Sequence, residues 1–334
     1  MAVKTAILFF SLCLPAVADL AAGQQALKNG DYATALKAFL PLARQGNAVA
    51  QFSLGVLYAH GQGVPQDYEE AAKWYGLAAA QGDAVAQYNL GVMYDNGQGV
   101  AQDYGEAAKW YALAAKQGYA AAQSNLGVLY ADGQGVAQDY KEGAKWYGLA
   151  AAQGEAGAQL SLGLLYDKGQ GVAQDYKEAA RWYRLAAAQG EASAQSNLGL
   201  LYYDGQGVAQ DYKEAAKWYR LAAEQGLAVA QYNLGGLYSH GQGVAQDYKE
   251  AAKWYRLAAE QGDVTAHYNL GVLYDNGQGV PQDYVQAHMW FSLAGASGNA
   301  IGTKNRDIVG RKMTPEQIAE AQRRAREWKP KTSR

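Results

Sequence analysis

The chain repeats itself every 36 residues, and this period limits the folds that are open to it. A segment of the form Ala-x-x-x-Leu-Gly begins at residues 50, 86, 122, 158, 194, 230 and 266, and Gly-Gln-Gly-Val follows each copy at the same distance. A fixed period of this length is typical of proteins in which each unit stacks on its neighbours. We divide residues 47–298 into seven units: 47–82, 83–118, 119–154, 155–190, 191–226, 227–262 and 263–298.

Each unit is predicted to form two helices, which we call A and B. In unit 83–118, helix A runs from about Ala84 to Asp95, and Gly97 ends it in the left-handed conformation. Asp103 caps helix B, and its spacing to Glu106 predicts a reciprocal capping box. Since no stretch alternates with a period of two, we expect no sheet.

One face of helix A carries nearly the same residues in every unit, and we call these residues the framework. Gly91 lies in the middle of that face, where glycine weakens a helix, so we expect a neighbouring helix to approach it closely. The aromatic residues of helix B, such as Trp110 and Tyr111, have two interpretations. They could stack on sugars, but their helical spacing favours packing in the core.

The full pattern resembles a known repeat family. The motifs Ala-x-x-x-Leu-Gly-x-x-Tyr, Gly-x-Gly-Val-x-x-Asp-Tyr and Ala-x-x-Trp-Tyr are similar to the Sel-one-like repeat, a relative of the tetratricopeptide repeat. The resemblance implies an all-α fold, a right-handed α-solenoid of antiparallel helix pairs, that serves as an interaction scaffold. Residues 19–46 resemble a degenerate N-terminal capping repeat.

Residues 299–334 depart from the repeat and are predicted to form basic C-terminal capping helices. They hold ten Lys and Arg residues against four Asp and Glu residues. Thr314 and Gln317 predict a capping box at the start of one helix. Ala321 and Trp328 are placed to cover the last repeat, because a solenoid needs a terminal element with a polar outer face.

The opposite side of helix A changes from unit to unit, and we call it the variable stripe. In unit 83–118 it comprises positions 85, 88, 92, 95 and 96. The A helices of such solenoids line the concave face, and tyrosine beside polar residues suits peptide binding. The alternative is drift at solvent-exposed positions. The candidate partner-binding residues are Phe52, His60, Tyr88, Asp95, Asn96, Asp167, Tyr203, Tyr232, His240, Tyr268 and Asp275.

The first 18 residues have the pattern of a signal peptide. Lys4 precedes an apolar run from residue 6 to 14, and Ala16-Val17-Ala18 predicts cleavage after Ala18. The run is too short to span a bilayer, and no later segment is a candidate. We therefore expect an exported protein, periplasmic or secreted. The single cysteine, Cys13, lies in this segment, which excludes a disulfide scaffold.

No motif in the sequence predicts catalysis, a cofactor or a metal. The nucleophile and phosphate-loop motifs are absent, and the four His residues have no ligand spacing. Asp95 and Asp103 flank a Gly-rich loop without the ligand run of a calcium site. The net charge of −2 gives no attraction to nucleic acid.

We expect a monomeric, non-enzymatic scaffold that binds a peptide or protein in a groove lined by the A helices. Two alternatives stay open. The first is a cell-wall or β-lactam hydrolase, which the family resemblance implies because some exported relatives have been linked to that activity. The second is a structural spacer of the cell envelope. The sequence does not identify the partner.

Overall fold

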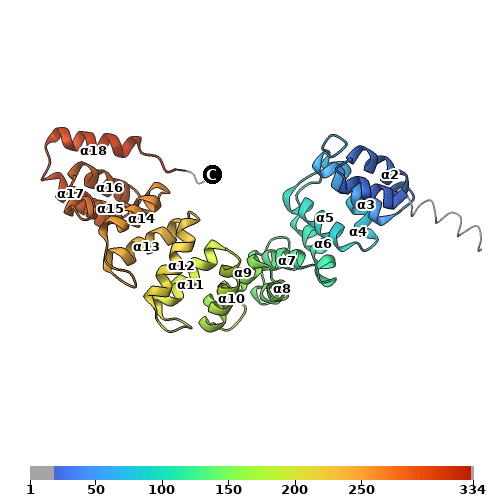
Figure 1. Cartoon of the computed structure of the whole chain (residues 1–334), viewed down its shortest axis with the longest axis horizontal. Helices are drawn as coiled ribbons and strands as arrows, with labels where there is room; N and C mark the ends of the chain where they lie inside the picture. Colours follow the sequence, from blue (N-terminus) through green and yellow to red (C-terminus); the bar gives the residue numbers. More distant parts are fainter. Residues whose placement is uncertain (1–18, 332–334) are drawn as a thin grey trace, which may run out of the picture. The chain divides into compact units, whose positions relative to one another are not determined.

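The computed structural model describes residues 19–331, and all regular structure in that range is helical (Figure 1). The predicted signal peptide, residues 1–18, lies outside the described residues. Residues 19–28 are helical and are followed by α2 (Tyr32–Arg44). After the repeats come α17 (Ala300–Gly310) and α18 (Pro315–Glu327).

Each of the seven units forms the predicted pair of helices, and all fourteen helices have 13 residues. The A helices are α3 (Ala48–His60), α5 (Ala84–Asn96), α7 (Ala120–Asp132), α9 (Ala156–Lys168), α11 (Ala192–Asp204), α13 (Ala228–His240) and α15 (Val264–Asn276). The B helices are α4 (Tyr68–Ala80), α6 (Tyr104–Lys116), α8 (Tyr140–Ala152), α10 (Tyr176–Ala188), α12 (Tyr212–Glu224), α14 (Tyr248–Glu260) and α16 (Tyr284–Ala296).

The seven repeats and the terminal helices are divided between two larger compact units, and from here on "the first unit" and "the second unit" mean these two. The first comprises the residues up to 158 together with 170–172, and the second comprises 159–169 and the residues from 173 onward. The same repeat geometry occurs inside each unit, so the contacts below are described within one unit at a time.

The loop between the two helices of a repeat depends on two glycines. Gly97 ends α5 with φ 68°, in the left-handed region. Gly99 has φ 69°, and a Cβ there would lie only 2.1 Å from the carbonyl oxygen of Tyr68. The loop therefore rests directly on the first turn of α4, in the preceding repeat, where no side chain would fit.

The start of helix B confirms one half of the predicted capping box and contradicts the other. The Asp103 carboxylate accepts hydrogen bonds from the backbone N–H groups of Gly105 and Glu106. The Asp103 N–H, however, donates to the carbonyl of Tyr94 at 2.9 Å, so Glu106 has no donor to reach back to. Glu106 instead pairs with Lys109 at 2.6 Å. At α18, by contrast, Thr314 and Gln317 form both halves of the box.

The framework face of helix A is buried as predicted, except that Tyr94 at its end is only partly buried. In α5 the residues Ala86, Gln87, Leu90, Gly91 and Met93 are all buried. A Cβ on Gly91 would lie 2.6 Å from Cδ1 of Tyr111, in helix B of the same repeat. The mid-helix glycine is therefore required by an aromatic ring that lies flush on the backbone of helix A.

The repeat tryptophans pack in the core, which favours the packing interpretation over sugar stacking. Trp110 lies against the core that α4 and α5 form at the junction between two repeats. Trp254 and Trp290 occupy equivalent places in the second unit and are 7% and 6% exposed. These three junctions, each within one compact unit, thus bury side chains from three helices.

A row of buried glutamines connects successive repeats. The Gln87 amide donates to the carbonyl of Ala79 in the preceding helix B at 3.1 Å, and its oxygen accepts from Gln117 at 2.8 Å. In the second unit, Gln195 and Gln225 form the same pair at 2.8 Å. Because the Gln87 and Gln195 side chains are buried, a lost bond would leave their polar groups unsatisfied, at a cost of about 1–3 kcal/mol.

The last repeat replaces this glutamine with His267, and α18 closes over it. The His267 Nε2–H donates to the carbonyl of Ala259 at 2.9 Å, and the ring stacks on Trp290. Trp328 lies edge-on to His267, with 4.9 Å between ring centroids. Ala321 of α18 is fully buried. The C-terminal segment thus covers the last repeat at the predicted residues.

The N-terminal segment contains a contact of the same kind as the repeats. A Cβ on Gly23 would lie 2.5 Å from the ring of Phe39, just as Gly91 faces Tyr111. Asp31 caps α2 by accepting from the N–H of Thr34. Residues 19–44 therefore share the helix-pair contact of a repeat, although the Gly-Gln-Gly-Val loop is missing.

Candidate partner-binding surface

The aromatic residues of the variable stripe are half-buried, because each leans on the helix B ring of its own repeat. The centroid of Tyr88 lies 5.9 Å from that of Tyr111 and 5.0 Å from that of Tyr119. In the second unit, Tyr232 lies 5.9 Å from Tyr255. Phe52 and Tyr268 make the same contact, both at 5.8 Å. These rings are fixed by packing, and each keeps part of its surface exposed.

Burial also changes the acidity of these phenols. It raises the pKa of the Tyr88 and Tyr232 hydroxyls above the ordinary value of 10.0, and Tyr119 adds to the effect at Tyr88. The hydroxyls therefore stay protonated at neutral pH and can donate hydrogen bonds.

Two stripe carboxylates are held in place by buried tyrosines. The Tyr111 hydroxyl donates to Asp95 at 3.0 Å, and the Tyr183 hydroxyl donates to Asp167 at the same distance. Burial and the adjacent carboxylate both raise the pKa of these tyrosines. Asp275 differs, because it pairs with Lys312 from the segment after α17 at 2.9 Å.

The other candidate residues lie near the ends of the A helices. His60 and Asn96 are exposed. The Tyr203 ring packs edge-on against Tyr212 at 5.2 Å, and its hydroxyl donates to Gln242 at 3.4 Å. His240 is exposed, and its Nδ1 lies 2.8 Å from the carbonyl oxygen of Gly236.

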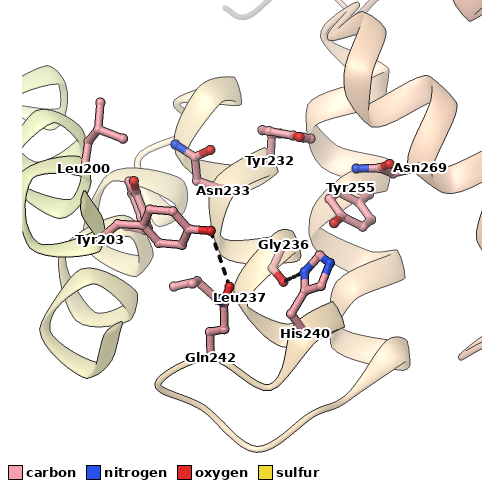
Figure 2. Close-up of a pocket in the computed structure, with 11 residues that line it drawn as sticks. Leu200, Tyr203, Tyr232, Asn233, Gly236, Leu237, His240, Gln242, Tyr255 and Asn269 are labelled. Atoms are coloured by element: carbon pink, nitrogen blue, oxygen red, sulfur yellow. Dashed lines mark hydrogen bonds between the residues drawn. The ribbon is translucent and has the colours of Figure 1, made fainter. Parts of the chain in front are cut away.

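Three hollows lie along the stripe, each between neighbouring A helices. In the first unit, His60, Asn89 and Val92 line a hollow of 190 Å³. In the second unit, His240, Tyr268 and Asn269 line one of 390 Å³. The third, of 190 Å³, brings together Tyr203, Tyr232 and His240 (Figure 2). The remaining candidates line none of these three hollows: Phe52, Tyr88, Asp95, Asn96, Asp167 and Asp275.

The hollows also contain asparagines that were not among the predicted residues. They follow the Tyr88 position by one residue and recur with the 36-residue period. Asn233 and Asn269 both reach the third hollow (Figure 2). A side-chain amide both donates and accepts, which suits it to the main chain of a bound peptide. The period itself was the available signal, since the position holds Ser53, Asn89, Asn125, Ser161, Asn197, Asn233 and Asn269.

The Ser292 side chain lies close to His288 in α16, and its geometry is that of an ordinary helix. The Ser292 hydroxyl donates to the carbonyl of His288 at 2.7 Å, whereas the imidazole Nδ1 is 3.4 Å away. Between residues 19 and 331, no three or more His, Cys, Asp or Glu side chains are grouped to hold a metal ion. None of the helices in that range is long and apolar enough to cross a membrane.

The repeat pattern matches one protein family throughout. The Sel1 repeat matches seven times in succession, over residues 48–83, 84–119, 120–155, 156–191, 192–227, 228–263 and 264–299. The chain is a Sel1 repeat protein. Each match begins one residue after our units. Proteins of this family act typically as non-catalytic scaffolds for protein interactions.

Two solved structures are similar to this Sel1 repeat protein over nearly its whole length. A Sel1 repeat protein from Oxalobacter formigenes is 34% identical, with a TM-score of 0.67, over 86% of this chain and 85% of that one. The uropathogenic Escherichia coli protein c5321, a protective antigen with an SLR fold, is 31% identical, with a TM-score of 0.57, over 94% and 91%. No curated protein matches. The predicted all-α repeat solenoid is confirmed.

Proposed function

We propose that this Sel1 repeat protein is an exported scaffold that binds an extended segment of a protein partner along its variable stripe. The observation that carries the proposal is the contrast between the two sides of helix A. The framework side is buried and nearly constant, whereas the other side holds half-exposed aromatic side chains that differ between repeats.

The fixed rings make such a surface efficient. Binding costs free energy when a side chain loses rotamer freedom, about 0.5–1.5 kcal/mol for each one immobilised. Tyr88, Tyr232 and Tyr268 already rest on helix B rings, so most of that cost is met during folding. The asparagines beside them supply donors and acceptors for a peptide main chain.

Export is a separate part of the proposal. It rests on the sequence of residues 1–18, which lie outside the described part. The similar Escherichia coli protein is a protective antigen, which supports a location that host defences reach. Mass spectrometry of the chain from fractionated cells tests this. We expect the periplasmic or secreted form to begin at Asp19, and an intact chain confined to the cytoplasm would refute export.

The binding proposal is tested by replacing Tyr88, Tyr232 and Tyr268 together with Ala. A control variant carries the same number of apolar-to-Ala changes on helix B, at the exposed residues Leu113, Leu185 and Leu257. Both are crosslinked in the cell envelope, and the captured proteins are identified by mass spectrometry. The proposal requires the partner of the unmodified chain to be retained by the leucine variant and lost by the tyrosine variant. Equal capture by both variants, with helicity intact, would refute it.

A further inference from the structure

One repeat has a gap in its variable stripe. Gly236 stands in α13 where the other six repeats have valine or leucine: Val56, Val92, Val128, Leu164, Leu200 and Val272. A Cβ on Gly236 would meet only the Tyr255 hydroxyl, at an ordinary 3.7 Å. The adjacent Gly235 is different, since its Cβ would lie 2.7 Å from the Tyr255 ring. Packing therefore requires Gly235 but not Gly236, although glycine weakens the helix at both positions.

The missing side chain opens the third hollow of the stripe. Gly236 forms part of its wall, and Tyr203 from α11 and Tyr232 from α13 stand beside it (Figure 2). Leu200 and Leu237 contribute apolar surface. A valine at position 236 would place its methyl groups in this space.

The same gap lets a histidine lie against the backbone. His240 follows Gly236 by one helical turn, and its Nδ1 lies 2.8 Å from the Gly236 carbonyl oxygen. His60 holds the equivalent place after Val56 and makes no such bond. Since a carbonyl only accepts, Nδ1 of His240 must carry a proton. In the neutral ring Nε2 is then an acceptor that can receive a hydrogen bond.

A second polar group at the hollow has no partner within the described residues. The side-chain amide of Asn233 forms no hydrogen bond with any other residue between 19 and 331. The equivalent Asn89, by contrast, donates to the carbonyl of Val85. An amide that lines a hollow without a partner of its own can bond to a ligand.

The lining also restricts what can enter. It contains no Asp, Glu, Lys or Arg, so a charged group would lose its water without gaining a counter-charge. The volume of 190 Å³ exceeds the roughly 150 Å³ of a cavity that accepts benzene. Aromatic walls favour another ring in an edge-on or offset arrangement. The acceptor that His240 supplies at the rim suits a ring with a hydroxyl group.

We propose that the Gly236 hollow is the anchor site for a tyrosine side chain of the partner. The phenol ring packs beside Tyr203 and Tyr232, and its hydroxyl donates to Nε2 of His240. The Asn233 amide, two helical turns away in α13, bonds to the main chain of the same partner segment. This inference rests on the proposed function, because it assigns one partner residue to one place on the stripe.

The probe for the test is N-acetyl-tyrosinamide, titrated into the full chain labelled with ¹⁵N-glycine. We expect saturable shifts of the Gly235 and Gly236 amide signals. The control probes are the corresponding amides of phenylalanine, leucine and lysine. Phenylalaninamide binds more weakly by about two- to tenfold, because it lacks the hydroxyl. The leucine and lysine amides produce no saturable shift at these glycines.

Two variants locate the site. Gly236→Val fills the hollow with the residue of four other repeats and weakens tyrosinamide binding at least tenfold, as observed on the Gly235 signal. His240→Leu removes the acceptor, so it weakens tyrosinamide binding but leaves phenylalaninamide binding unchanged. Saturation by tyrosinamide that survives Gly236→Val, equal binding of the leucine or lysine amide, or no saturable shift at all would each overturn the proposal.

This outcome is separable from that of the function proposal. The titration uses no partner protein, so its failure leaves the capture experiment with the triple tyrosine variant standing. Conversely, tyrosinamide binding at Gly236 in a chain that captures no partner would refute the scaffold proposal and, with it, the assignment to a partner, while the hollow would still be a binding site for a tyrosine side chain.

Discussion

Gly235 and Gly236 are neighbours in the middle of α13, and replacing each with Ala gives a matched test of the packing. Helix propensity alone predicts that both changes stabilise the protein by about 0.5–1 kcal/mol. The added methyl group on Gly236 makes an ordinary contact at 3.7 Å, so Gly236→Ala should keep this gain. The methyl group on Gly235 would lie 2.7 Å from Cδ1 of Tyr255, so something must move.

The cost of that movement can be bounded. Tyr255 is only 3% exposed, so its ring cannot shift without disturbing its neighbours. Overpacking of a buried site typically costs about 1–3 kcal/mol. We therefore expect Gly235→Ala to be less stable than Gly236→Ala by about 1–3 kcal/mol. In a Tyr255→Leu background the ring is gone, and this difference should largely disappear.

Urea unfolding followed by circular dichroism measures the difference between the two variants. Because repeat arrays do not always unfold in one step, hydrogen exchange of the α13 amides provides the local measurement. If Gly235→Ala is as stable as Gly236→Ala by both methods, the ring does not lie on the helix as described, and the explanation of the framework glycines fails.

Three further predictions concern the capping and junction contacts. Burial lowers the pKa of His267 from 6.5, so the unfolded chain binds a proton more readily than the folded chain. Thermal stability should therefore fall as the pH drops below about 6.5. Replacing His267 with Gln, the residue of the other repeats, should reduce this pH dependence; part of it should persist, because burial also lowers the pKa of His288. Trp328→Ala should speed hydrogen exchange in α18 but not in α13. The reason is that the Trp328 ring contacts His267 and Trp290, which both belong to the last repeat. Asp211→Ala should destabilise α12 by about 0.5–2 kcal/mol, since its carboxylate accepts from two first-turn N–H groups; unchanged urea stability would contradict the capping role.

The sequence was sufficient to predict the helices, because their signals are local and repeated. The period, the capping Asp103 and the helix-ending Gly97 each act within a few residues of their position. The reciprocal bond from Glu106 was predicted wrongly for a non-local reason. The Asp103 N–H is already bonded to Tyr94 on the preceding helix, and no local pattern reveals that competitor.

The candidate surface was less predictable, because it depends on neighbouring side chains. A helical wheel places Tyr88 opposite the framework, but it does not show that Tyr111 and Tyr119 cover one side of its ring. Nor does it reveal that Gly236 opens a hollow. Its neighbour Gly235 is also a glycine, but there the ring of Tyr255 from helix B occupies the space beside the backbone. The role of the residues themselves in binding stays a prediction.

The loop glycine that rests on a preceding carbonyl, as Gly99 does on Tyr68, has a genetic consequence. The same contact recurs at Gly135 on Tyr104 and at Gly243 on Tyr212. The surfaces by which neighbouring repeats contact each other are therefore interchangeable. Recombination between copies within the gene can therefore delete or duplicate 36 codons and still encode matching joints. Such events alter the number of contact points in single steps, whereas point substitutions alter their chemistry.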